Sequence, residues 1–284
     1  MIKEILDKLQ IENIKNIIRI KSVEDNAEYN VWKIETLNKN LLLKETKSNE
    51  YEIYKEFLSV LDSAVPKIYS QMNYKDKHYI LTEFIEGTDL CKSNRTNLIK
   101  VLDSLIYITN VYWNNNIKDN IGYTYKKSLE SRIDRGKYLP ADIKIYYDKF
   151  IECYNSTTKT FCHDDLLPFN VIVNDSAYLI DWEHAGILPY PTPLVRLIAH
   201  GKDDPKYIFY MTDEDKNFAI EYFYKHCIKY HNVNYDEYIK TINLFLVYEY
   251  SEWIMLGNKY ENTNTERYNY YIDLCRKHIS CNLK

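Results

Sequence analysis

The chain has 284 residues, with 37 lysine and arginine residues against 41 aspartate and glutamate residues and a formal net charge of −4 at pH 7. This length can bury a large core, either in one two-lobed domain or in two domains. The near-balance of charge provides no basic field for nucleic acid, so we expect no nucleic-acid partner.

The cysteines and the first 20 residues indicate the cellular setting. The six cysteines show neither a CxxC pair nor a zinc-like spacing with histidine, which predicts free thiols in a reducing compartment. The first 20 residues carry charges throughout and lack the apolar core of a signal peptide. No run approaches the roughly 18 apolar residues of a membrane span, so we expect a cytoplasmic protein without a membrane partner.

The first 18 residues show apolar positions at helical spacing, which predicts a short helix leading into a sheet that begins near 17–22. These positions are Ile5, Leu9, Ile14 and Ile17. Two further apolar runs, at 29–36 and 39–46, flank a polar stretch. We expect them to form two neighbouring strands of the same sheet.

Lys44 ends the apolar run LLLK and is followed by a helical pattern over 48–62. Glu50 lies on the inward face of that predicted helix, together with later apolar residues. We therefore expect Glu50 to pair with Lys44, with Glu52 as the alternative partner. The competing interpretation is a solvated lysine at the end of a strand.

The middle of the chain changes from strand to helix patterns at Gly87. Residues 65–87 predict a strand, a turn at 73–77, a second strand and a linker. The pattern is then helical over 97–113, as expected for a core helix. The charged stretch 125–159 predicts further helix, broken between the glycine at 136 and the proline at 140.

The stretch FCHDDLLPFNVIVNDSAYLIDWE carries the densest set of functional residue types. His163, Asp165 and Asn170 reproduce the H-x-D-L-x-x-x-N spacing of a kinase catalytic loop. The apolar runs VIV and YLI then flank a polar turn, which predicts a β-hairpin. Such a hairpin would place Asp181 beside Asn170.

These residue types fit phosphoryl transfer, in which a protein positions the acceptor hydroxyl and neutralises charge on the phosphates. Asp165 would accept or orient the proton of the hydroxyl, with His163 in the same catalytic set. Asn170 and Asp181 offer the hard oxygen ligands that Mg²⁺ prefers. The competing interpretation is a surface loop in which aspartate and asparagine only form turns.

Two amphipathic helices are predicted near the end of the chain, over 213–231 and 235–260. In the second, Glu249 and Trp253 lie four residues apart and Glu252 is adjacent, which places acid and indole on neighbouring helix faces. A cationic acceptor would fit there. The alternative is a core helix with two solvated glutamates.

The segments HDDLLPFN and LIDWEHAG resemble the aminoglycoside phosphotransferase and choline kinase family of small-molecule kinases. This resemblance implies an α+β, protein-kinase-like fold with two lobes. Residues 1–86 would form a small β-rich lobe with the hinge, and residues 87–284 a larger helical lobe. The sequence departs from the family at Asp164 and at 188–197, where the family has other residue types.

The resemblance also implies the nucleotide site, with ATP and Mg²⁺ as the expected ligands. The Glu83 carbonyl and the Ile85 amide would bind adenine, and Lys44, fixed by Glu50, would bind the phosphates. The segment 21–36 contains no glycine, so Ser22 would contribute to covering the phosphates. The competing interpretation of 22–30 is a plain hairpin turn.

The predicted function is ATP-dependent phosphorylation of a hydroxyl on a small, cationic, aminoglycoside-like molecule. Glu249, Glu252 and Trp253 would hold that acceptor. A choline or ethanolamine type of kinase is the alternative within this class. A catalytically silent nucleotide-binding module on the same fold is the alternative outside it, and we expect a monomer or weak dimer.

Overall fold

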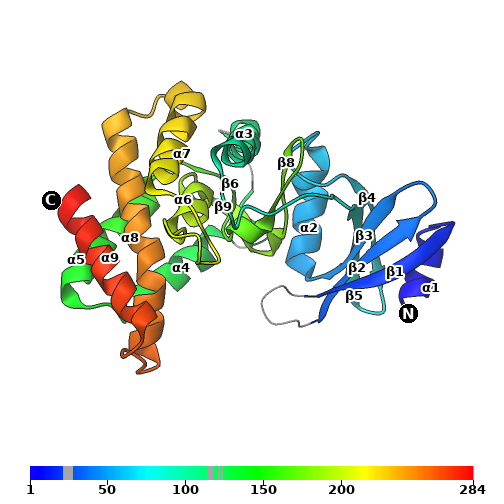
Figure 1. Cartoon of the computed structure of the whole chain (residues 1–284), viewed down its shortest axis with the longest axis horizontal. Coiled ribbons are helices and arrows are strands. Elements are labelled where there is room, and N and C mark those ends of the chain that lie inside the picture. The colour runs from blue at the N-terminus through cyan, green and yellow to red at the C-terminus, as the bar shows by residue number, and fades with distance from the viewer. Residues whose placement is uncertain (22–27, 114–117, 121, 123, 284) are drawn as a thin grey trace.

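The N-terminal part of the chain forms a five-stranded antiparallel sheet at one end of an elongated molecule (Figure 1). The computed structural model describes residues 1–21, 28–113, 118–120, 122 and 124–283. The strand order is β1-β2-β3-β5-β4. The strands are β1 (Ile14–Lys21), β2 (Glu28–Thr36), β3 (Asn40–Thr46), β4 (Ile68–Tyr74) and β5 (Lys77–Glu83). This confirms the strands predicted on both sides of residues 37–40 and 73–77.

The two faces of the sheet pack against different helices because side chains alternate along a strand. On one face, Leu41 and Leu43 of β3 pack with Ile5 of helix α1 (Ile2–Lys8). On the other face, Ile80 of β5 packs in the core that includes helix α2 (Ser48–Glu56). Lys44 follows Leu43 in β3, so its side chain lies on the α2 face.

The predicted N-terminal helix is shorter than its apolar pattern suggested. Helix α1 ends at Lys8, and Gln10 and Asn13 both have a φ of 56°. The left-handed backbone at these two residues turns the chain, and Ile14 and Ile17 then lie in β1. The prediction of helix through Ile17 was wrong, because these residues pair with β2, and an irregularity in the register between Ile14 and Asn16 lets Ile14 and Ile17 pack against the same core.

The C-terminal part of the chain is helical and surrounds the larger core. Its helices are α3 (Arg95–Tyr112), α4 (Tyr125–Gly136), α5 (Ala141–Ser156), α6 (Thr192–Ala199), α7 (Asp213–His226), α8 (Tyr235–Lys259) and α9 (Glu266–Asn282). The core helix after Gly87 and the break between α4 and α5 are confirmed; α6 and α9 were not predicted. No helix in the described ranges combines the length and apolarity needed to span a membrane.

Two small sheets carry the HDDLLPFN segment and its hairpin. Strand β6 (Lys159–His163) pairs with β9 (Ala185–Pro189), and β7 (Val171–Val173) pairs with β8 (Ala177–Leu179). The predicted hairpin is therefore confirmed. Figure 1 shows β8 between the sheet and the helical region, and the Leu179 amide of β8 donates to the carbonyl of Ala64, in the segment that follows α2.

The linker from β5 to α3 is fixed against this hairpin. Thr88 and Val173 exchange two backbone hydrogen bonds of 3.0 and 2.7 Å. A Cβ atom at Gly87 would lie 2.5 Å from the Val173 carbonyl oxygen, so glycine permits this close approach. The predicted two-lobed, kinase-like fold is confirmed, while the lobe boundary between residues 86 and 87 stays a prediction.

Candidate active site

The loop from His163 to Asn170 is held in shape by its own side chains. The His163 Nε2 donates to the Ile180 carbonyl over 2.8 Å, and the Asp165 amide donates to His163 Nδ1 over 3.2 Å. The Asn170 Nδ2 donates to the Asp165 carbonyl over 2.7 Å. The spacing of the motif therefore has a direct structural cause, since each residue fixes another.

His163 does not have the catalytic role that we expected from the sequence. It is 1% exposed, and both ring nitrogens are bound to backbone groups. Burial lowers its pKa, which favours the neutral ring that these two hydrogen bonds require. His163 is a positioning residue that ties the Asp165 loop to the backbone preceding Asp181.

Lys44 joins the sheet, helix α2 and the hairpin at one point. Its Nζ lies 2.6 Å from Glu50 Oε1 and 2.7 Å from Asp181 Oδ1. Glu50 is 1% exposed and also accepts a hydrogen bond from the Thr46 hydroxyl. The predicted pairing of Lys44 with Glu50 is confirmed, and Asp181 is a second partner.

The charges of this cluster stabilise one another. Burial lowers the pKa of Lys44, but Glu50 and Asp181 raise it by more, so it lies well above its usual value. Burial raises the pKa of Asp181, and Lys44 lowers it by more, so the net shift is downward. Asp181 also has left-handed backbone angles, φ 63° and ψ 62°, which are uncommon for a residue with a side chain and typical of functional sites.

Asn170 and Asp181 form a donor set that suits Mg²⁺. The Ile180 amide donates to the Asn170 carbonyl over 2.9 Å, which places Asp181 next in the chain beside Asn170. The Asn170 Nδ2 is used by the loop, so its Oδ1 is the atom left for a metal. An amide oxygen and a carboxylate next to each other are hard ligands of the kind that Mg²⁺ prefers.

The other nucleotide-binding residues predicted from the sequence are Glu83, Ile85 and Ser22. Glu83 is the last residue of β5, where its amide donates to the Lys67 carbonyl over 2.8 Å. Ile85 follows in the linker and is 8% exposed. Ser22 lies outside the described residues. The adenine-binding roles of Glu83 and Ile85 and the phosphate role of Ser22 stay predictions.

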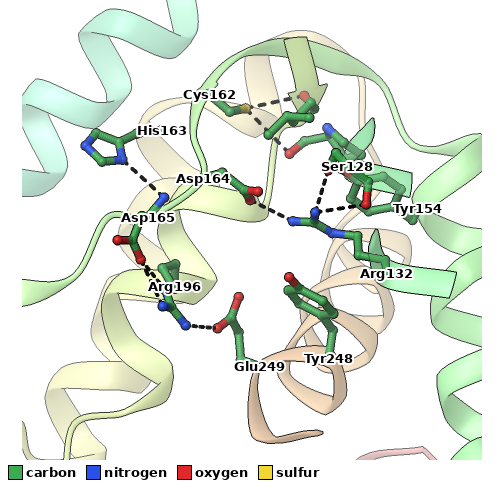
Figure 2. Close-up of polar contacts among 12 residues, drawn as sticks. Ser128, Arg132, Tyr154, Cys162, His163, Asp164, Asp165, Arg196, Tyr248 and Glu249 are labelled. Carbon is green, nitrogen blue, oxygen red and sulfur yellow. Dashed lines mark hydrogen bonds and ion pairs between the residues drawn. The ribbon is translucent and has the colours of Figure 1, made fainter. Parts of the chain in front are cut away.

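The two adjacent aspartates of the loop point to opposite sides (Figure 2). Asp164 Oδ1 accepts a hydrogen bond of 2.6 Å from Arg132, and its side chain is 11% exposed. Asp165 Oδ1 accepts from Nε and a terminal nitrogen of Arg196 over 3.1 and 2.8 Å, and its side chain is 31% exposed. Of the two, Asp165 is the carboxylate that a substrate can reach.

Solved structures share this arrangement of elements. No protein-family model matches the chain, and no curated protein matches it by sequence. Aminoglycoside phosphotransferase APH(4)-Ia gives a TM-score of 0.60 at 11% identity, covering 98% of this chain and 97% of that chain. Spectinomycin phosphotransferase APH(9)-Ia, bound to AMP, gives a TM-score of 0.58 at 15% identity, and the match covers 99% of each chain. A type VIII aminoglycoside-3′-phosphotransferase gives a TM-score of 0.59 at 11% identity, and the match covers 87% of this chain and 97% of that chain.

The chain has the aminoglycoside phosphotransferase fold. Identities of this size establish the arrangement of the chain and leave the acceptor open.

Asp164 stabilises the fold through a buried cation. The Arg132 side chain is 2% exposed and also donates to the Ser128 hydroxyl. Its guanidinium lies 4.7 Å from the ring centroid of Tyr154 and 4.5 Å from that of Tyr248 (Figure 2). Burial lowers the pKa of Arg132, and Asp164 raises it by more, so the guanidinium stays charged. The departure at Asp164 therefore has a structural explanation.

We predict that Asp164→Ala lowers the free energy of unfolding by about 3–5 kcal/mol, because it leaves Arg132 buried and unpaired. Asp142→Ala is the matched control, since Asp142 pairs with Arg276 at the surface. That variant should lose at most about 1 kcal/mol. Urea denaturation of both variants tests this, and equal losses would contradict the structural role of Asp164.

Arg196 is the residue that the sequence interpretation missed. Besides Asp165, it contacts Glu249 Oε2 over 2.9 Å and Glu252 Oε2 over 2.7 Å. His200 also contacts Glu249 Oε2, at 3.3 Å. His200, Glu249 and Glu252 offer ligand atoms within 4.8 Å of one another, but the Arg196 guanidinium lies among them, so we assign no metal there.

This network corrects the predicted role of Glu249 in holding a cationic acceptor. Its side chain is 4% exposed and already bound to Arg196 and His200, so an acceptor cannot reach it. Glu252 and Trp253 do line a cavity next to Arg196. Glu252 is nevertheless bound to Arg196, and the indole face of Trp253 carries the Arg267 guanidinium at 4.2 Å.

The Glu249 network predicts a specific acid sensitivity. Burial raises the pKa of Glu249, and Arg196 with His200 lowers it by more, from 4.5 to about 2. A depressed pKa stabilises the fold fully above pH 4.5, and this stabilisation is lost as pH falls towards 2. The contribution is up to about 3 kcal/mol.

We therefore expect the stability difference between wild type and Glu249→Gln to shrink as pH falls from 4.5 to 2. Thermal unfolding over this pH series measures it. Glu237→Gln, an exposed position on the same helix, is the control and should show no such change. A difference that stays constant with pH would contradict the ionised state of Glu249.

The signals that could have revealed these residues are weak in the sequence. Arg132 lies in a charged stretch where no site was visible, although a second acid next to Asp165 requires a partner if it is buried. Arg196 lies in the segment noted only as a departure from the family. Its partners lie 31, 53 and 56 residues away along the chain, beyond any local pattern.

Proposed function

We propose that this protein is an ATP-dependent phosphotransferase that phosphorylates a hydroxyl group of a small molecule. The observation that carries this proposal is the position of Lys44 between Glu50 and Asp181, next to the Asp165 loop. A lysine fixed by a helix glutamate is the arrangement with which kinases bind the α- and β-phosphates. A solved neighbour in complex with ADP and hygromycin B supports a nucleotide donor.

The Asp165 carboxylate would act on the acceptor. Arg196 occupies Oδ1, which leaves Oδ2 for the hydroxyl of the substrate. The hydroxyl oxygen forms a bond to the γ-phosphorus as the bridging oxygen leaves with ADP, and Asp165 takes the proton. Arg196 holds the carboxylate in place and does not itself touch the reacting atoms, so it is a positioning residue.

Lys44, Asn170 and Asp181 would bind the donor. The Lys44 ammonium would neutralise charge on the phosphates. Glu50 would keep this ammonium oriented when Asp181 binds a metal ion. Asn170 and Asp181 would hold Mg²⁺, which shields the phosphate charge when bound. The alternative function, a silent nucleotide-binding module, is disfavoured because Asp165, Asn170 and Asp181 are all present in a connected arrangement.

A transfer assay tests this function. ATP with a labelled γ-phosphate is incubated with pools of amino sugars, amino alcohols, nucleosides and hydroxy acids, and label in a new compound is measured. We expect transfer that requires Mg²⁺ and is lost in Asp165→Asn. Amino sugars are the first class to test, because hygromycin B is bound in a neighbour. Nucleotide binding without transfer to any pool would favour the silent module.

A further inference from the structure

A cavity of about 750 Å³ is lined in part by Arg196, whose guanidinium binds Asp165. Leu167 of the catalytic loop and Glu252 of α8 form part of its wall. The segment before α7 and the first turn of α9 complete it, and they contribute Lys202 and Arg267. Neither cation has a carboxylate partner within the part of the chain that the structure describes.

Lys202 is held among aromatic rings. Its Nζ lies 3.9 Å from the ring centroid of Tyr207 and 3.8 Å from that of Tyr270. Its backbone is fixed by hydrogen bonds with Phe209 and Met211, of 2.9 and 3.1 Å. Burial lowers the pKa of Lys202, so the ammonium would gain stabilisation from an anion in the cavity.

Arg267 occupies the aromatic surface that a cationic ligand would need. Its guanidinium lies 4.2 Å from the ring centroid of Trp253, and the residue is exposed to the cavity side of α9. A stacked guanidinium keeps its hydrogen-bond donors free at the edge of the group, where a carboxylate or phosphate can bind in a bidentate manner.

The charged groups at the cavity fall into two sets. At Arg196, the three carboxylates of Asp165, Glu249 and Glu252 share one guanidinium, so this cluster keeps an excess of negative charge. The remaining charged groups of the wall are Lys202, Arg267 and Glu266. Among these three groups two cations face one carboxylate, and an oxyanion would bind to Lys202 and Arg267 rather than at the acidic cluster around Arg196.

We propose that the acceptor carries an oxyanion group, a carboxylate or a phosphate, which Lys202 and Arg267 bind while its hydroxyl reaches Asp165. This proposal rests on the proposed phosphotransferase function and names its acceptor class. It replaces the cationic acceptor predicted from the sequence. Trp253 contributes by orienting Arg267, and Glu252 by holding Arg196 away from the ligand.

Binding of four matched sugars tests the acceptor class without requiring turnover. D-Glucuronate, D-glucose 6-phosphate, D-glucose and D-glucosamine share a pyranose ring and differ in charge. Their dissociation constants are measured by tryptophan fluorescence in full-length protein saturated with Mg-AMP-PNP. We expect at least one anionic sugar to bind about ten-fold or more tightly than glucosamine, with glucose between them. The stronger of the two anions identifies carboxylate or phosphate as the preferred group.

Two pairs of variants locate the binding. Lys202→Gln and Arg267→Gln should each weaken binding of the anionic sugar about ten-fold. Lys206→Gln and Arg276→Gln are the controls, since they remove the same charges from exposed residues outside the cavity wall and should bind like wild type. The melting temperature of Lys202→Gln shows whether that variant has a folding defect. Arg267 is exposed, so Arg267→Gln should melt like wild type.

Tighter binding of glucosamine, equal binding of all four sugars, no binding of either anion, or an anion preference that survives both cavity variants would overturn the proposal. A failure of the proposed function has a different signature. It would appear as absent binding of Mg-AMP-PNP itself, measured in the same protein before any sugar is added.

Discussion

Asp181→Ala should lower turnover by at least about 10²–10³-fold and weaken Mg-nucleotide binding. The carboxylate is proposed as a metal ligand and also contacts Lys44 Nζ at 2.7 Å, so its loss removes two charge interactions on the phosphates. Steady-state kinetics over a Mg²⁺ titration measure the effect, with an increase in the Mg²⁺ concentration needed for half-maximal rate.

Asp175→Ala is the matched control for Asp181. It removes the same side chain from the exposed turn of the same hairpin, away from Lys44. We expect unchanged kinetics there. Unchanged turnover and Mg²⁺ dependence in Asp181→Ala would contradict the metal assignment, even if the fold is intact.

Asp165→Asn should lower kcat by about 10²–10⁴-fold, the usual contribution of a general base, while nucleotide binding is retained. The amide cannot take the proton, but it can still accept the hydrogen bonds from Arg196, so the loop should keep its position. Single-turnover kinetics together with nucleotide titration separate the chemical step from binding.

Asp164→Asn provides the comparison at the neighbouring position. Asp164 faces Arg132 in the interior, so this variant should lose stability and keep most of its kcat. If Asp164→Asn lost more kcat than Asp165→Asn at equal folded fraction, the assignment of the base from the motif spacing would be wrong.

The connected parts of the site could be predicted from the sequence because they follow local rules. The apolar runs around residues 174–176 predicted the hairpin, and the hairpin places Asp181 beside Asn170. The helical spacing over 48–62 put Glu50 on the inward face of α2 and predicted that it meets Lys44, at the end of the run LLLK. In each case a period of two or 3.6 residues decides which side chains share a face.

The electrostatics of the acceptor side could not be predicted in this way. Glu249 and Trp253 were recognised as neighbours on one helix, but their partners Arg196 and Arg267 come from other helices. Whether a buried carboxylate is free for a ligand or neutralised internally depends on the packing of α6 against α8. The sequence therefore identified the residue types of the acceptor side without their internal partners, and the charge of the acceptor stays a prediction.

Calorimetric titration of the wild-type protein with AMP-PNP tests the central claim most directly, because it depends on neither the acceptor nor the chemical step. In the presence of Mg²⁺ we predict saturable binding with one site per chain, weakened at least about ten-fold, or about 1.4 kcal/mol, when Mg²⁺ is removed by a chelator. Absent binding, or binding of the same strength with and without Mg²⁺, would contradict a phosphotransferase site built from Lys44, Asn170 and Asp181.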